Sequence, residues 1–537
     1  MKHAKASIFL LVITALAATF TSAAFAASDV PADIQAVFDK PLYKDASWGL
    51  RVVDLHSGKV LIDLKPQKQF YIGSVRKTFT IGELLNEIGP HHTYNTPVFR
   101  QGRVDDDGVL HGNLVMVASG DLTMDGRTNR DGTIAVTDFD HNEADSLGNA
   151  ELTKPNPLQG YRELARQTAA SGIKEVKGNV VVDDRLFQPF NFRQQFNVTP
   201  AFVNDDVVDL TIHPTSEGNL ASVKWRPVSP ALDVRNTLIT SGPGSKSTLT
   251  LDPEYPQCIG RPDCTAAITG QLPIDFVPPL TNKFPLVQTF RITKPSNYAR
   301  TVLIQELEAA GVKVDAPDVA ENPVQLLPPR NVAPHWTKVA QLIGLPYSDN
   351  AKFILKVSYN IGADTSLLLY GLTQGVNNEK DALRVEQKNL SSHYGIKPDE
   401  YHFLDGSGGG ETTAITPAVT KMLSVMSTKP DFPVYLHSLP ILGVDGSLGF
   451  VTDFKSNPTL KGATGHIFAK PGSYVVGTES GGMLVKGQAF GGYIDTKSGQ
   501  HLVYMLVVNN VKVNALDGLL QAFQDQGTIS AILWRDH

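Results

Sequence analysis

The chain has 537 residues, of which 42% are hydrophobic and 19% are charged, and its formal net charge is −6. This composition is typical of a globular protein with a large core, and the length suggests about three or four domains. The net negative charge and the lack of a Lys/Arg-rich run argue against a nucleic-acid or other polyanionic partner.

The N-terminal segment is typical of a secretory signal peptide. Lys2 and Lys5 precede an apolar run over residues 8–18, and Ala24-Phe25-Ala26 has the small-x-small form of a cleavage site. We expect residues 1–26 to be removed on export, which predicts a periplasmic location. The apolar run is too short to favour a transmembrane helix, and no later stretch approaches ~18 consecutive apolar residues, so we expect no integral membrane anchor. An uncleaved N-terminal anchor is the alternative.

A β-hairpin is predicted after a short helical pattern between residues 28 and 45. Residues 48–55 alternate in the manner of a strand, and residues 60–64 form the returning strand. An apolar run of helical spacing, which begins at Phe79, follows the hairpin. A hairpin that leads into a helix is an α/β opening.

Ser74 and Lys77 stand at the start of this predicted helix. Residues three apart share one helix face, so the hydroxyl and the amine are expected to be neighbours. A serine is a poor nucleophile until a base takes its proton, and a lysine serves as that base only when its pKa is lowered. Ser74 and Lys77 are therefore candidates for nucleophile and general base. The spacing also arises by chance, since Ser171 and Lys174 repeat it in an apparent helix-to-strand turn.

The middle of the chain is expected to be an inserted, strand-rich region over residues 94–295, divided into two subdomains. Its first part shows strand patterns at residues 98–104 and 112–118, and a polar stretch follows from residue 120 to 148. A helix near residues 158–170 leads to a strand at residues 180–183.

The second part, about residues 202–290, is rich in β-branched residues and turns. It contains Cys258 and Cys264, the only two cysteines of the chain. In an oxidising compartment this pair is expected to close a small loop as a disulfide. Two thiols without nearby histidines make a poor zinc site, and we expect no metal site.

The C-terminal part returns to alternating helices and strands. Residues 500–510 read as a buried strand that a helix follows. We therefore expect one discontinuous domain, built from residues 27–93 and 296–537, into which the middle region is inserted.

A Ser-x-x-Lys enzyme also needs a polar Ser-x-Asn-type loop, which passes protons to the leaving group, and a cationic strand, ordinarily Lys-Thr-Gly, which holds the substrate carboxylate. Two further segments of the chain are candidates for these elements. Ser358-Tyr359-Asn360 lies between two apolar helical stretches and is a candidate proton-transfer loop. Ser348-Asp349-Asn350 is its rival, but Ser348 only begins the first of these helices and resembles an N-cap. Lys470-Pro471-Gly472-Ser473 precedes an apparent strand and is the candidate cationic strand.

With these motifs, the chain resembles the D-alanyl-D-alanine carboxypeptidase/endopeptidase family of class C low-molecular-mass penicillin-binding proteins. The likeness covers nearly the whole mature chain in the right order. Further matching segments are Gly112–Val115, Ser119–Thr123, Gly178–Asp184, Ala363-Asp364, Leu404–Gly408 and Leu439–Leu448. The resemblance implies an α/β (α+β) fold: a discontinuous transpeptidase domain like that of penicillin-binding proteins and serine β-lactamases, with a strand-rich insertion.

The resemblance also implies a mechanism. Ser74 attacks the carbonyl of the penultimate D-alanine of a peptidoglycan stem peptide, Lys77 acts as the base, and an acyl-enzyme forms. The substrate partners are thus peptidoglycan stem peptides, and β-lactams acylate the same serine as inhibitors. The enzyme is a carboxypeptidase, an endopeptidase or both, and it needs no metal or organic cofactor.

The remaining roles follow from the same resemblance. Ser358 relays the proton to the leaving group, and Asn360 orients the substrate amide. Lys470 attracts the substrate carboxylate and helps to keep Lys77 neutral. The backbone N–H groups of Ser74 and Ser473 form the oxyanion hole.

Pro471 departs from the Lys-Thr-Gly pattern of the family, because it has neither the hydroxyl nor the N–H of the usual residue. Two alternatives stay open. The first is a serine esterase or β-lactamase with the same Ser-Lys pair, against which the large insertion argues. The second is a catalytically weak cell-wall-binding homologue, which only Pro471 supports.

The histidines in polar segments are not expected to take part in the chemistry. His91, His92 and His141 lie in polar segments and are expected to face solvent, whereas His466, four residues before Lys470, is a candidate for the cleft. The three glycines of residues 408–410 are expected to form a flexible turn.

Overall fold

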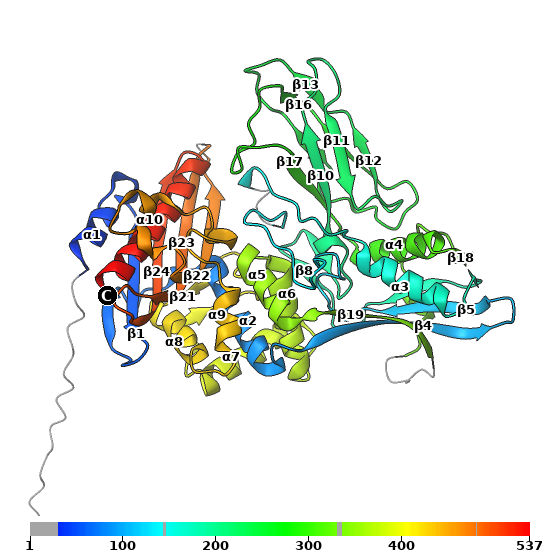
Figure 1. The fold of residues 1–537 in the computed structure, drawn as a ribbon, viewed down its shortest axis with the longest axis horizontal. Coiled ribbons are helices and arrows are strands. Elements are labelled where there is room, and N and C mark those ends of the chain that lie inside the picture. Colours follow the sequence, from blue (N-terminus) through cyan, green and yellow to red (C-terminus); the bar gives the residue numbers. More distant parts are fainter. Residues whose placement is uncertain (1–29, 143–146, 330–335, 480) are drawn as a thin grey trace, which may run out of the picture.

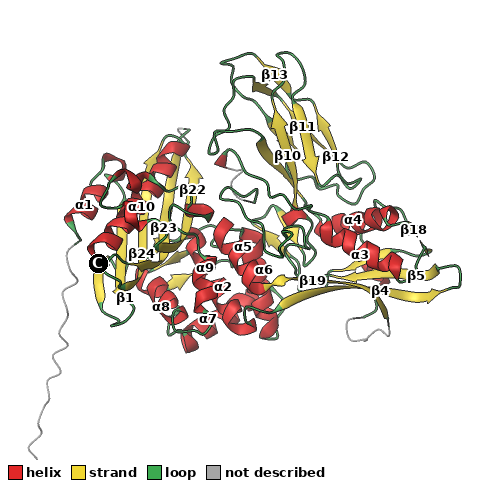
Figure 2. Ribbon diagram, in the orientation of Figure 1, coloured by secondary structure: helices red, strands yellow, loops and turns green. Residues whose placement is uncertain are grey.

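The computed structural model describes residues 30–142, 147–329, 336–479 and 481–537 (Figure 1). The predicted signal peptide, residues 1–26, lies outside them. Within the described ranges, no helix combines the length and the apolar character that crossing a bilayer requires. A sheet with helices on both faces lies at one side of the molecule, and a second region with a long sheet extends from it (Figure 2).

The first sheet joins the two ends of the chain. Its five strands have the order β2-β1-β24-β23-β22, and every neighbouring pair is antiparallel. Their bounds are Val60–Leu64, Ser47–Asp54, His501–Val513, Met483–Asp495 and Ile467–Gly477, in that order. The predicted hairpin is confirmed as β1 and β2. Strand β22 is an edge strand, and its outer side lies against the turn that carries Ser74.

Strand β24 is buried, as its apolar run predicted, and its two faces lie in two different cores. Leu502, Tyr504 and Leu506 pack in the core formed with α1 (Ala32–Phe38) and α10 (Leu516–Asp536). Val503, Met505 and Val507 alternate with them and pack in the core on the other face. Side chains in a strand point to opposite faces in turn, so one apolar run supplies both cores.

A group of helices covers this second face. They are α2 (Lys77–Ile88), α5 (Tyr347–Val357), α6 (Asn360–Thr373), α7 (Glu379–His393), α8 (Thr416–Met426) and α9 (Phe432–Ser438). A small sheet of β3 (Phe70–Tyr71), β21 (Thr413–Ala414) and β20 (Tyr401–His402) lies beside them. Helix α2 runs through the middle of this group and contacts α5, α6 and α8.

A second core lies in the middle of the chain. Its main sheet has the order β18-β6-β5-β4-β19, with β7 paired to β5. The bounds are Lys313–Val314, Glu175–Val176, Val109–Val117, Thr93–Val104, Thr337–Pro346 and Val180–Asp183. Helices α3 (Gln159–Ala170) and α4 (Pro295–Ala309) pack on it.

Smaller sheets complete this region. They contain β10 (Val207–His213), β11 (Ser222–Arg226) and β17 (Leu286–Arg291); β12 (Asp233–Asn236), β14 (Thr250–Asp252) and β15 (Thr265–Thr269); and β13 (Ile239–Ser241) and β16 (Gln271–Pro273). The pair β8 (Phe190–Phe192) and β9 (Phe196–Val198) comes from the same part of the chain, but its side chains pack in the core with the helix group of the first region. The predicted disulfide between Cys258 and Cys264 is confirmed.

The expected domain division stays a prediction, with one change at its second boundary. Helix α4 begins at Pro295 and strands β18 and β19 follow it, yet all three pack with the middle region. Strand β19 pairs with β4, so the chain leaves the middle sheet beside the strand by which it entered that sheet. We therefore extend the proposed insertion to Pro346.

Candidate functional site

Ser74 lies in the 3₁₀ turn Gly73–Arg76, between β3 and the first residue of α2, Lys77. The Nζ atom of Lys77 donates a hydrogen bond to the Oγ atom of Ser74 at 2.7 Å. The i, i+3 spacing thus brings the hydroxyl and the amine together although the serine precedes the α-helix itself. The second copy, Ser171, ends α3, where its hydroxyl donates to the carbonyl of Thr168.

Lys77 is fully buried and its amine lies among three oxygen atoms. Besides Ser74 Oγ, it donates to Asn360 Oδ1 at 2.6 Å and to the carbonyl oxygen of Ser407 at 2.8 Å. The expectation for Asn360 concerned the substrate amide, and its contact with Lys77 adds a second task. The sequence did not predict the contact with the Ser407 carbonyl, because every residue type has a backbone carbonyl and none signals this contact.

The turn that presents this carbonyl is held by Asp405. Its Oδ1 atom accepts the N–H groups of Ser407, Gly408 and Gly409 at 3.0, 2.6 and 3.0 Å. Gly408 has φ +93°, and a Cβ there would lie 2.1 Å from the carbonyl oxygen of Gly73. The glycines expected in a flexible turn therefore allow the turn to pack directly on the backbone beside Ser74.

Ser358 and Asn360 reach the same place from the junction of α5 and α6. Ser358 ends α5 with φ +69°, and Asn360 is the first residue of α6. Both line the pocket that contains Ser74. The rival Ser348 lies in the first turn of α5, where its N–H donates to the carbonyl of Pro90, and it is not among the residues that line this pocket.

The Lys470 segment forms part of β22. The Lys470 side chain is buried, and its Nζ atom donates to the carbonyl oxygen of Pro471 at 2.9 Å. A proline is tolerated here because β22 is an edge strand, which needs hydrogen bonds on one side only. The hydroxyl of Ser473 donates to Gln488 Oε1, so it is engaged in the sheet.

Two glycines let β22 approach Ser74. A Cβ on Gly472 would lie 2.1 Å from the carbonyl oxygen of Ile72 and 2.7 Å from the backbone nitrogen of Ser74. A Cβ on Gly73 would lie 2.7 Å from the backbone nitrogen of Ser473. The backbones of the serine turn and of β22 are thus in direct contact, as a shared oxyanion site requires.

Gly472→Ala is expected to lower the rate constant of acylation by a penicillin about 10²-fold, since a displacement of 1 Å can cost that much. The new methyl group would push β22 away from Ser74. Gly477→Ala is the matched control on the same strand, because no atom of the residues that the structure describes lies within 4 Å of a Cβ at Gly477. Stopped-flow acylation of both variants measures the effect, and equal rates would contradict it.

The pocket around Ser74 has a volume of about 460 Å³. Its lining includes Ser74, Ser358, Asn360, Lys470 and Ser473, which the sequence singled out, together with Asp138, Phe139, Asp140, Arg193 and Leu280 from the middle region. His466 is not among its lining residues and lies instead against the ring of Trp534. The middle region therefore forms one wall of the candidate site.

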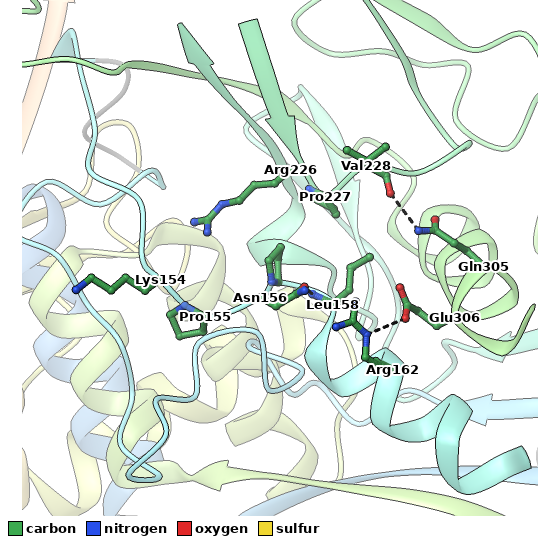
Figure 3. Close-up of a pocket in the computed structure, with 11 residues that line it drawn as sticks. Lys154, Pro155, Asn156, Leu158, Arg162, Arg226, Pro227, Val228, Gln305 and Glu306 are labelled. Atoms are coloured by element: carbon green, nitrogen blue, oxygen red, sulfur yellow. Dashed lines mark hydrogen bonds and ion pairs between the residues drawn. The ribbon is translucent and has the colours of Figure 1, made fainter. Parts of the chain in front are cut away.

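A second pocket of about 440 Å³ lies between α3, α4 and the end of β11 (Figure 3). Arg162 Nε donates to the Glu306 carboxylate at 3.2 Å, and Gln305 donates to the carbonyl of Val228. Its lining shares no residue with the pocket of Ser74. It holds no nucleophile beside a base, so the candidate active site is the first pocket.

Asp140, which lines the pocket of Ser74, also belongs to a buried cluster of charged side chains. His141, which was expected to face solvent, is only 3% exposed, and this expectation was wrong. Its Nδ1 atom pairs with Asp209 at 2.6 Å and its Nε2 atom with Asp205 at 2.8 Å. Asp140, His141 and Asp205 are close enough to share a metal ion, but the guanidinium of Arg127 contacts all three.

The protonation of His141 is expected to make folding stability depend on pH. Burial by itself lowers its pKa, but the carboxylates of Asp209 and Asp140 outweigh burial and raise the pKa to about 10, above the ordinary 6.5. Because the folded state holds this proton more tightly, the contribution to unfolding free energy is complete below pH 6.5. It is lost as the pH rises through about 10.

Urea unfolding of the wild type and His141→Asn between pH 6 and 10 tests this dependence. The wild type is expected to exceed the variant by about 3–5 kcal/mol at pH 6, since the variant leaves carboxylates unpaired, and by less at pH 10. The exposed His111, paired with Asp105, supplies the control His111→Asn. A difference that stays constant with pH would refute the assignment.

Comparison with known proteins adds to this geometry. The family described as D-Ala-D-Ala carboxypeptidase 3 (S13) matches residues 30–524. A D-alanyl-D-alanine carboxypeptidase from Actinomadura sp. (strain R39) is 23% identical over 432 residues, which cover 76% of this chain and 70% of the relative.

Solved structures of penicillin binding protein 4 (dacB) from Haemophilus influenzae have a similar fold. One has a TM-score of 0.65 at 15% identity and covers 92% of this chain and 98% of its own. The other, in complex with a β-lactam, has a TM-score of 0.63 at 16% identity and covers 94% and 99%. These likenesses confirm the predicted fold class, and the match of the family to residues 30–524 spans both ends of the chain and its middle region.

Proposed function

The chain belongs to the D-Ala-D-Ala carboxypeptidase 3 (S13) family and is a serine-type D-Ala-D-Ala carboxypeptidase, and from this we propose that Ser74 is its nucleophile and Lys77 its general base. The observation that carries the assignment is the hydrogen-bond distance of 2.7 Å between the buried Lys77 Nζ and Ser74 Oγ. As a base the amine is neutral: its two N–H groups donate to Asn360 Oδ1 and the Ser407 carbonyl, and its lone pair takes the proton of Ser74 as the oxygen attacks.

We propose the following acylation step. Ser74 Oγ bonds to the carbonyl carbon of the penultimate D-alanine while its proton passes to Lys77 Nζ. The negative charge that develops on the carbonyl oxygen is stabilised by the N–H groups of Ser74 and Ser473. One such donor is commonly worth about 3 kcal/mol. The contact between Gly472 and the serine turn supports this pair of donors.

The second half of the step breaks the C–N bond. The proton held by Lys77 passes through the hydroxyl of Ser358 to the departing amine, and the terminal D-alanine leaves. Water then attacks the acyl-enzyme with the same groups in reverse order and releases the shortened peptide. Asn360 holds Lys77 and orients the substrate amide, and Lys470 attracts the substrate carboxylate.

We propose that the natural substrates are peptidoglycan stem peptides and that β-lactams acylate Ser74 as inhibitors. The enzyme then works in the periplasm after removal of residues 1–26. Cleavage of peptide cross-links as well as terminal D-alanine is part of this proposal. An endopeptidase that cuts cross-links has less need of a clamp for a terminal carboxylate than a strict carboxypeptidase, so the missing hydroxyl at Pro471 matters less for it.

Labelling with a fluorescent penicillin tests the proposal. The purified mature protein is expected to gain one adduct, which peptide mapping by mass spectrometry places on Ser74, and Ser74→Ala is expected to gain none. Hydrolysis of a D-Ala-D-Ala peptide, a simple ester and a penicillin by the same preparation separates a DD-peptidase from an esterase or β-lactamase. A folded protein without an adduct would favour the cell-wall-binding alternative.

A further inference from the structure

The residue between Ser358 and Asn360 connects their turn with the inserted region. Tyr359 is 1% exposed, and its hydroxyl donates to the backbone carbonyl of Asp205 at 3.1 Å. Its ring lies 5.0 Å from the ring of Phe353, centroid to centroid. The ring thus packs beside α5, while the hydroxyl reaches a residue that is 154 positions away in the sequence.

Asp205 belongs to a turn with an unusual backbone. Asn204, Asp205 and Asp206 have φ values of +49°, +56° and +63°, a region that residues other than glycine rarely adopt. Such a conformation persists only where surrounding contacts fix it. Here the Asp205 carboxylate accepts hydrogen bonds from Arg127 Nε at 2.7 Å and Asn142 Nδ2 at 3.3 Å.

The contacts of Asp205 are part of a balanced ion-pair network. It consists of three cations, Arg127, His141 and Arg226, and three carboxylates, Asp140, Asp205 and Asp209. All but Arg226 are buried, and in a medium of low dielectric the loss of one partner leaves a charge uncompensated. The Arg127 guanidinium also lies 4.0 Å from the Phe353 ring centroid, so the network touches α5 directly.

The backbone conformation of Ser358 also has to be stabilised by surrounding contacts, since a φ of +69° is rare for a serine. On one side of it, Lys356 is buried and pairs with Asp445 at 2.6 Å. On the other side stands Tyr359 with its bond to Asp205. The strained residue that we assign to proton transfer is therefore held between two anchors, one of which lies in the inserted region.

We propose that Tyr359 is a positioning residue. Through its hydroxyl, the buried network of Arg127, Asp140, His141, Asp205 and Asp209 holds Ser358 and Asn360 in place against Lys77. The inserted region then determines the rate of acylation and does more than enlarge the substrate surface. This inference rests on the roles proposed above for Ser358 and Asn360.

Tyr359→Phe removes only the hydroxyl and provides the test. The acylation rate constant at saturating penicillin is expected to fall about 10-fold, because small displacements of catalytic groups are costly. The half-saturating concentration is expected to stay unchanged. Tyr493→Phe is the matched control, since the buried Tyr493 hydroxyl donates to the carbonyl of Leu423 at 2.7 Å and loses an equivalent bond. It is expected to keep the wild-type rate constant.

A double-mutant cycle with His141→Asn tests the route through the network. His141→Asn is expected to lower the same rate constant, and the double variant is expected to be no slower than the slower single variant. Tyr359→Phe at the wild-type rate, or full additivity, would overturn the inference while the Ser74 adduct of the wild type still stands. A wild type that forms no adduct would instead refute the proposed function.

Discussion

Lys77→Met is expected to lower the rate constant of Ser74 acylation by about 10²–10⁴-fold, the usual contribution of a general base. Methionine keeps the length and apolar character of the side chain but cannot accept the proton of Ser74. It also ends the contacts with Asn360 Oδ1 and the Ser407 carbonyl, which fix the position of the amine. The time course of covalent labelling by penicillin measures the loss.

The second Ser-x-x-Lys segment provides the control for this substitution. Lys174 follows Ser171 at the same spacing, but it lies exposed in the turn between α3 and β6. Lys174→Met is therefore expected to label at the wild-type rate. Labelling of folded Lys77→Met within 10-fold of the wild-type rate would show that another group takes the proton.

Arg76→Met is expected to lower the free energy of unfolding by about 3–5 kcal/mol, the cost of breaking a buried ion pair. Arg76 is fully buried, its Nη2 atom donates to Glu386 at 2.5 Å, and its Nε atom donates to the carbonyl of Asp405. Burial, and next the Glu386 carboxylate, raise the pKa of Glu83 well above its ordinary value. Because the Glu386 side chain is itself buried, Arg76→Met would leave its carboxylate without this counter-charge.

Urea unfolding measures this loss against a surface pair of the same chemistry. Arg384 pairs with Asp381 at 3.2 Å on α7, where the arginine is 73% exposed. Arg384→Met is expected to change stability by less than about 1 kcal/mol, because solvent screens exposed pairs. Equal losses in the two variants would mean that the Arg76 pair contributes no more than an exposed one.

The local sequence was sufficient where the signal is local. The spacing of Ser74 and Lys77 predicted that their side chains meet, and an apolar run predicted that β24 is a buried strand. The six-residue spacing of Cys258 and Cys264 predicted their disulfide. In each case the signal is a short-range one of helix, strand or loop geometry, which can be read within a window of about ten residues.

Sequence reasoning was weaker where polar residues come together from distant segments. The polar stretch around His141 was expected to be exposed, but partners at Asp205 and Asp209 make its burial possible. A buried charge is stable only with its counter-charges, and these stand more than 60 residues further along the chain. Composition in a local window cannot reveal such partners.

The sequence by itself determined the candidate nucleophile, its base, the family resemblance and the order of the elements around them. Only the tertiary structure decided that Ser358 rather than Ser348 shares a pocket with Ser74. It also decided that the Ser407 carbonyl contacts Lys77 and that residues of the middle region line the pocket. The physical reason is that periodicity and spacing act within one element. Contacts between elements depend on how their cores pack, and packing joins residues that no local pattern relates.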